Sequence, residues 1–141
     1  MKIMSAAEWR EFVSLGTRTG KLAVTRKDGS PHVVPIWFVL DGDSFLFNTG
    51  KASLKGRILG RDPRVSMCVD DDTAPYAFVM LNGVAELSDD LDESLHWATK
   101  IGERYMGAER GAEFGRRNAV PEEYLVRVRI TKVVAQAEIA S

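Results

Sequence analysis

The sequence predicts a mainly β protein, with about six antiparallel strands and two or three peripheral helices. Apolar and polar residues alternate in several short segments, most clearly in Tyr124–Ile130, as they do in strands with one buried face. Tight-turn signals, Asp28-Gly29 and Asp41-Gly42, separate neighbouring segments. An antiparallel sheet of this size closes into a barrel or a sandwich, because closure hides its edges.

The chain begins with a short predicted helix. Ser5 and Glu8 have the spacing of a capping box, and Gly16 is a suitable stop. The apolar residues between them share one helical face: Trp9, Phe12 and Val13. Three strands should follow, at 21–26, 32–40 and 44–48.

The second half of the chain mixes helices with strands. We expect a short helix over 53–59, capped by Ser53, and strands at 65–69 and 76–87, with a bulge at Asn82-Gly83. Ser88 should cap a helix that reaches Met106, and residues 107–118 are weakly helical. The apolar stripe of the long helix is Leu91, Leu95, Ala98, Ile101 and Tyr105. The final strand covers 124–130 and can continue to 139.

Composition limits the classes of function. A length of 141 residues suits one domain over 1–141. The formal net charge of −1 creates no global field that would attract nucleic acid or an anionic membrane. The longest apolar run has eight residues, Val33–Leu40, and the first eleven residues include charges where a signal peptide is apolar, so we expect a cytoplasmic protein.

The familiar catalytic signatures are absent from the sequence. There is no nucleophile elbow and no phosphate-binding glycine loop, and His32 and His96 have no partner at a metal-ligand spacing, so we expect neither a catalytic side chain nor a metal. Asp70–Asp72 is interpreted as a solvated loop. Cys68 is the only cysteine, and its apolar strand predicts a buried residue without a catalytic role.

Two segments stand out. Residues 33–38 are apolar on both alternating faces, yet Pro35 cannot donate to a β-ladder, so the strand should be irregular there. A planar cofactor lying against this strand could use the freed amides of Ile36 and Trp37. The alternative is an edge strand with a bulge, in which Trp37 is an ordinary core residue.

The second segment, residues 48–57, leads from a strand into a helix and is rich in hydroxyls and cations. Lys55 and Arg57 are expected in the first turns of this helix, where cations oppose the helix dipole. A bound phosphate would reverse that cost, with Ser53 as a further ligand. A solvated basic loop is the alternative.

With Leu22-Ala23-Val24-Thr25, Arg61-Asp62-Pro63 and Gly83-Val84-Ala85, these segments resemble the pyridoxamine-phosphate-oxidase-like split-barrel superfamily. Within it, the sequence is most similar to the reductases that use the deazaflavin coenzyme F420. The resemblance covers about Leu22 to Val84. It implies a six-stranded antiparallel split β-barrel (the FMN-binding split barrel) with peripheral helices, which forms a homodimer with the cofactor in the interface.

The resemblance also assigns residues to the cofactor. The ring would lie on Pro35, Ile36 and Trp37. The segment that holds the phosphate-bearing tail would contribute Asn48, Thr49, Lys51, Ser53, Leu54, Lys55 and Arg57. Tyr76 and Ala77 would come from the partner subunit.

The implied function is that of an F420-dependent oxidoreductase, which transfers a hydride from reduced deazaflavin to a small unsaturated or conjugated organic substrate. The pyridoxamine phosphate oxidases carry an arginine–histidine motif near the C-terminus, whereas Arg127–Lys132 contains no histidine, which argues against that activity. An FMN-dependent enzyme on the same barrel and a non-catalytic F420- or FMN-binding protein remain as alternatives.

Overall fold

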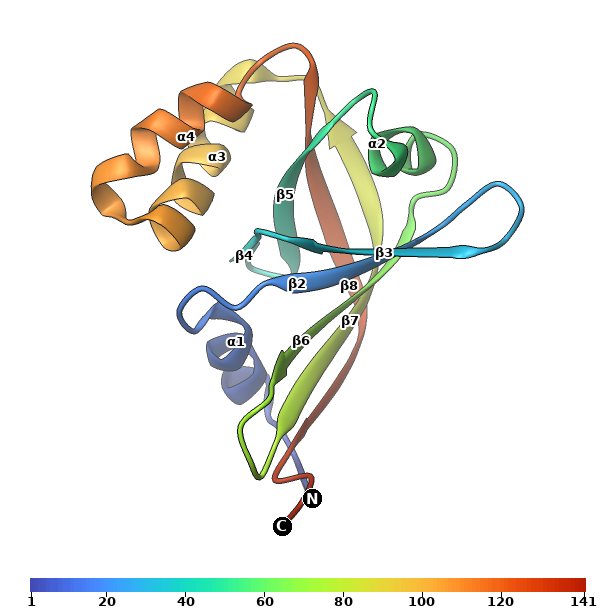
Figure 1. Cartoon of the computed structure of the whole chain (residues 1–141), viewed down its shortest axis with the longest axis vertical. Coiled ribbons are helices and arrows are strands. Elements are labelled where there is room, and N and C mark those ends of the chain that lie inside the picture. Colours follow the sequence, from blue (N-terminus) through green and yellow to red (C-terminus); the bar gives the residue numbers. More distant parts are fainter.

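The computed structural model describes residues 1–141. Its centre is an eight-stranded antiparallel sheet in the order β3-β2-β6-β7-β8-β5-β4, with β1 paired to β8. Figure 1 shows these strands curling around a common interior. The strands are β1 (Lys2–Ile3), β2 (Gly20–Thr25), β3 (Pro31–Ile36), β4 (Val39–Asp41), β5 (Ser44–Gly50), β6 (Arg64–Asp71), β7 (Ala77–Ser88) and β8 (Glu123–Ala137).

The chain itself brings the two ends of the sheet together. β3 and β4 lie at opposite ends of the strand order, yet only Trp37 and Phe38 separate them in sequence. Inward-facing side chains fill the space that this closure creates, and they include Leu22, Phe38, Phe45, Phe47, Met67, Leu81 and Val126, all without solvent exposure. The predicted mainly β split-barrel fold is therefore confirmed.

Five helical segments surround the sheet: α1 (Ala6–Ser14), α2 (Leu54–Leu59), α3 (Leu91–Met106), the short 3₁₀ helix η1 (Ala108–Arg110) and α4 (Gly111–Asn118). In Figure 1, α3 and α4 pack together on one side of the upper end, α2 lies across from them, and both termini lie at the lower end. The predicted capping box of Ser5 and Glu8 is present. No helix combines the length and the apolar character needed to cross a membrane.

The predicted strand 32–40 is divided in the structure. Its first part pairs with β2, and its second part pairs with β5, so the ladder breaks where the chain crosses from one edge to the other. Pro35 itself stays in register with Lys21 and Ile36 with Gly20, so the irregularity expected from the missing amide donor appears one residue beyond Pro35. The division and the unpredicted β1 raise the strand number from six to eight. The predicted bulge at Asn82-Gly83 is confirmed.

Some predictions of burial and capping are wrong. β3 is not buried on both faces, because it is an edge strand and no layer of this chain covers its outer face, where Val33 is 58% exposed. Cys68 is only partly buried, because Val65, Met67 and Val69 take the inward positions of β6. In α3, Leu91 and Leu95 are exposed, whereas Ser94, Ala98, Ile101 and Gly102 are buried. Asp90, not Ser88, caps this helix.

Candidate cofactor-binding site

A hollow of about 260 Å³ lies at the upper end of the barrel, between β3, β5, α2 and the α3–α4 pair. Five residues proposed from the sequence line it: Pro35, Ile36, Trp37, Asn48 and Lys55. The last residues of β3 therefore lie beside Asn48 of β5 and Lys55 of α2, which both belong to the basic segment 48–57. The fold brings together the two segments that the sequence singled out separately.

Trp37 forms an aromatic wall of this hollow, and two helices fix its ring. The indole stacks on the Tyr105 ring of α3, with centroids 5.1 Å apart and an interplanar angle of 4°. The Phe114 ring of α4 packs against it at 5.8 Å. Trp37 is still 38% exposed, so it offers apolar surface to a ligand. The prediction that Trp37 could be an ordinary core residue does not hold.

The end of α3 fixes the backbone at the break between β3 and β4. The Tyr105 hydroxyl accepts a hydrogen bond from the Phe38 amide (3.2 Å) and donates one to the Arg18 carbonyl (2.8 Å). The Arg104 guanidinium donates to the Phe38 and Val13 carbonyls, at 2.7 Å each. Burial lowers the pKa of Arg104 and raises the pKa of Tyr105. These bonds hold the aromatic wall in place.

Three polar groups near the hollow lack the partners that buried groups normally have. The Asn48 amide donates to Ser94 Oγ (3.3 Å), but Asn48 Oδ1 is buried without a partner. Lys55 is half-buried and its ammonium group makes no hydrogen bond or ion pair, and burial lowers its pKa. Glu123 Oε2 is also buried without a partner, and burial raises the pKa of that carboxyl group. Buried polar groups without a hydrogen-bond partner destabilise the folded state unless a ligand or a water molecule supplies that partner.

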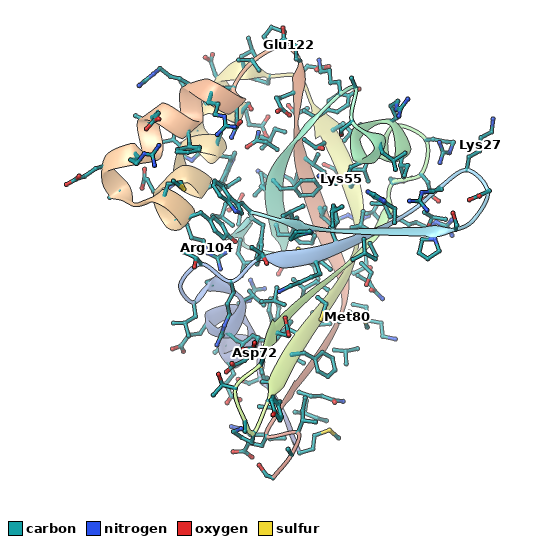
Figure 2. The ribbon with its side chains drawn as sticks, in the orientation of Figure 1. Lys27, Lys55, Asp72, Met80, Arg104 and Glu122 are labelled. Carbon is teal, nitrogen blue, oxygen red and sulfur yellow. The ribbon has the colours of Figure 1, made fainter.

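Close packing of α2 against the end of β5 sets the position of Lys55. A Cβ at Gly56 would overlap the Gly50 carbonyl oxygen, so only glycine permits this approach. Ser53 caps the helix by accepting from the Gly56 amide (3.0 Å), and its hydroxyl donates to the Gly50 carbonyl (2.7 Å). Thr49 Oγ1 lies 3.2 Å from Ser53 Oγ and is buried. Ser53 and Thr49 therefore hold the loop that carries Lys55. Figure 2 shows Lys55 extending from α2 towards β5.

The remaining residues of the basic segment face elsewhere. Lys51 forms an ion pair with Asp89 and lies over the Tyr124 ring. Arg57 falls in the last turn of the six-residue α2, where a cation is favoured, so its predicted conflict with the helix dipole is wrong. Leu54 and Arg57 line a second hollow, of about 490 Å³, beside the β2–β3 turn with Arg26, Lys27, Asp28, Ile58 and Arg61.

Tyr76 and Ala77 lie far from the upper hollow within one chain. They line a third hollow, of about 430 Å³, at the lower end between α1 and the β6–β7 turn. Arg18 lines it too, paired with Asp71 at 3.4 Å and placed over the Phe12 ring at 4.2 Å. Tyr76 and Ala77 could reach a cofactor in the upper hollow only from another subunit.

Sequence reasoning missed part of the lining of the upper hollow. Ile101 and Asn118 complete it from α3 and α4. Glu123, at the start of β8, is not part of this lining, but its carboxyl group lies near Gly50 and its charge acts on Lys55. The sequence predicts Ile101 as a member of an apolar stripe, but no local pattern shows which neighbour that stripe faces. Glu123 carried no signal, because a single glutamate before a strand is common.

Comparison with known proteins identifies the family. Residues 5–137 match the family described as pyridoxamine 5'-phosphate oxidase. The chain belongs to the pyridoxamine 5'-phosphate oxidase family. Members of this oxidoreductase-like family bind flavins or F420 in a split barrel, so the resemblance inferred from the sequence is confirmed. No curated protein sequence matches the chain.

Solved structures of similar proteins agree with this assignment. A conserved hypothetical protein from Mycobacterium tuberculosis is 31% identical, with a TM-score of 0.84 over 96% of this chain and 86% of that one. An F420 reductase is 27% identical, with a TM-score of 0.71 over 87% of this chain and 94% of that one. An FAD-binding protein from Mesorhizobium loti, at 24% identity, has a TM-score of 0.71 over 95% of each chain and shows the shared fold.

The residues of the upper hollow fit a cofactor of the flavin type. Trp37 offers a flat apolar surface, Lys55 an unpaired cation, and Asn48 Oδ1 an acceptor without a donor. A planar ring system with a polar edge and a phosphate-bearing tail would use each of these groups. In contrast, Arg127, in the region where the oxidases carry their substrate motif, is paired with Asp41 at 2.8 Å.

Proposed function

We propose that the protein is an F420-dependent oxidoreductase that reduces a small unsaturated or conjugated organic substrate. The supporting observation is the upper hollow, in which Trp37, Lys55 and the unpartnered Asn48 Oδ1 converge. The 27% identity to an F420 reductase over 87% of the chain favours F420 over FMN. FMN is the alternative cofactor.

The protein's own residues bind and orient rather than react. When bound, F420 supplies the hydride, so no triad or metal is needed. Trp37, held by Tyr105, would provide the surface for the ring, and Lys55 would neutralise the phosphate. Asn48 Oδ1 would accept a hydrogen bond from the ligand and fix its register. Precise orientation of donor and acceptor is worth up to about 7–11 kcal/mol of an activation barrier.

A homodimer would complete this site. The hollow of about 260 Å³ is smaller than the roughly 300–1,000 Å³ typical of small-molecule sites. Pro35, which lines the hollow, lies on the same exposed face of β3 as Val33. A second subunit on this face would enclose the cofactor and could bring its Tyr76 to the site. Light scattering should give twice the 15.6 kDa of one chain; the mass of one chain at micromolar concentration would contradict the dimer.

Cofactor titration followed by tryptophan fluorescence tests the proposed function. F420 should quench the emission, and Trp37→Phe should remove most of the quenching, because Trp9 is buried in the core and Trp97 lies beside Arg127. FMN is titrated in parallel. Tighter binding of FMN than of F420 would make the protein an FMN enzyme, and binding of neither would refute the proposal.

Turnover then separates an enzyme from a carrier. Reduced F420 should be oxidised in the presence of the protein and a panel of enones and quinones, with recovery of the absorbance of the oxidised cofactor. Tight binding without oxidation against any acceptor would indicate a protein that carries F420.

A further inference from the structure

A single charged residue, Lys55, lines the upper hollow. Lys51 is already paired with Asp89, and Arg57 lines a different hollow. Arg117 is exposed on α4, where water and salt screen its charge. A ligand anion therefore meets one unscreened cation.

Glu123 opposes that cation. In the β5–β8 ladder Glu123 lies opposite Gly50, and Asn48, two residues before Gly50, faces the same side of the sheet. The two buried acceptors without partners, Asn48 Oδ1 and Glu123 Oε2, are thus neighbours on one surface. No ion pair joins Glu123 to Lys55 within 4 Å, although the two charges affect each other's pKa.

The charged groups that act on Glu123 come from α2, from α4 and from the turn before β8. Burial has the largest effect on its carboxyl group and raises the pKa; Lys55 of α2 and Arg117 of α4 lower the pKa, and Glu122 raises it. An anion bound at Lys55 would add to the repulsion. Because Glu123 offsets the charge of Lys55, a second negative charge on the ligand gains little attraction to set against its larger cost of desolvation.

We propose that Glu123 is a specificity-determining residue that restricts the tail subsite at Lys55 to a singly charged phosphate, a diester rather than a monoester. This inference rests on the proposed function. F420 joins its phosphate to the rest of the tail as a diester with one charge and carries its carboxylates only beyond that diester, whereas FMN ends in a monoester that carries close to two charges above its second pKa of about 6. Glu123 therefore selects F420 against FMN through the charge of the phosphate group at Lys55, independently of the ring.

Dissociation constants for three ligands test this assignment: F420, FMN and riboflavin, measured by tryptophan fluorescence at pH 8. Unmodified protein should bind F420 more tightly than FMN. Glu123→Gln should strengthen FMN binding more than F420 binding, so that the preference for F420 falls about tenfold, the effect expected for one unit of ligand charge in a partly screened site. Riboflavin, which has no phosphate, should be unaffected. Glu122→Gln, at the exposed neighbouring position, is the matched control and should change nothing.

The pH dependence of the unmodified protein is a second arm that needs no variant. Lowering the pH from 8 to 5.5 converts the FMN phosphate towards one charge and favours the protonated form of Glu123, so the affinity for FMN should rise relative to that for riboflavin. If F420 binds, but Glu123→Gln leaves its preference over FMN unchanged and the pH leaves the ratio of FMN to riboflavin affinity unchanged, the role of Glu123 is refuted while the proposed function stands. If neither cofactor binds, the proposed function fails and this inference fails with it.

Discussion

Two half-buried cations in this molecule have opposite surroundings. Arg104 of α3 donates to the carbonyl oxygens of four residues, at 2.7–3.3 Å: Val13, Gly16, Arg18 and Phe38. Its guanidinium also lies over the Phe38 and Tyr105 rings. Lys55 of α2 makes no hydrogen bond or ion pair. Burial lowers the pKa of both side chains. In Figure 2, Arg104 lies between α3 and α1, whereas Lys55 faces the space beside β5.

The difference separates a structural cation from a binding one. A buried charge with all its donors used contributes to the fold, and its removal leaves carbonyl groups unsatisfied. A buried charge without partners destabilises the protein until an anion arrives. The number of satisfied donors, rather than burial or pKa, therefore distinguishes Arg104 from Lys55.

The largest effect is expected for Arg104→Met. The change leaves several buried carbonyl groups without donors and releases the backbone at Phe38, so the free energy of unfolding should fall by about 3 kcal/mol in urea denaturation. Arg104→Lys should not restore it, because an ammonium group cannot replace the planar fork. Arg110→Met, which removes an exposed cation with one carboxylate partner, is the control and should leave the urea midpoint almost unchanged. A small effect of Arg104→Met would remove the contrast between the two cations.

Lys55→Met should have the converse effect. Without ligand the thermal midpoint should stay the same or rise, because a half-buried charge is removed. The affinity for F420 should fall by about 10- to 150-fold, the loss of one charged hydrogen bond to phosphate. Arg57→Met in the neighbouring hollow should weaken binding far less, which titration of both variants will show. Equal losses would place the phosphate between the two hollows.

Tyr105→Phe tests the wall behind the cofactor. The ring stack on Trp37 is kept, but the bonds to the Phe38 amide and the Arg18 carbonyl are lost, so the free energy of unfolding should fall by about 1 kcal/mol. F420 affinity should decline a few-fold as Trp37 loosens. Tyr124→Phe is the control, because the Tyr124 hydroxyl makes no hydrogen bond within the chain. Unchanged affinity in Tyr105→Phe would show that the stack alone positions Trp37.

The smallest effect concerns the stability of the ligand-free protein against pH. The folded state raises the pKa of Glu123, so it binds more protons than the unfolded state between the ordinary glutamate pKa and the raised value. Stability from this group is therefore lost as the pH rises through that interval. Glu123→Gln should raise the thermal midpoint slightly at pH 7 and leave it unchanged at pH 4. The same gain at both values would mean that the charge of Glu123 is not its cause.

Local features of the fold followed from residues a few positions apart. The capping box at Ser5, the bulge at Asn82-Gly83 and the strand break after Pro35 each depend on backbone bonding within a short segment. The family resemblance extended this by assigning Pro35–Trp37 and Lys55 to one site, and the structure places them in one hollow. The apolar pattern alone gave the wrong burial for Cys68 and for the outer face of β3. Such a pattern does not show which layer of the fold covers each face of a strand.

The sequence by itself determined the strand pattern, the family and the polar segment that could hold an anion. Tertiary structure decided which of its cations is free. Arg57 and Lys55 look equivalent in sequence, but α2 directs one towards the β2–β3 turn and the other towards β5. Arg104 takes its hydrogen-bond acceptors, and Glu123 the cation that acts most on its pKa, from residues more than 60 positions away. The physical reason is that the state of a buried charge depends on the groups packed against it, and only the folded chain brings those groups together.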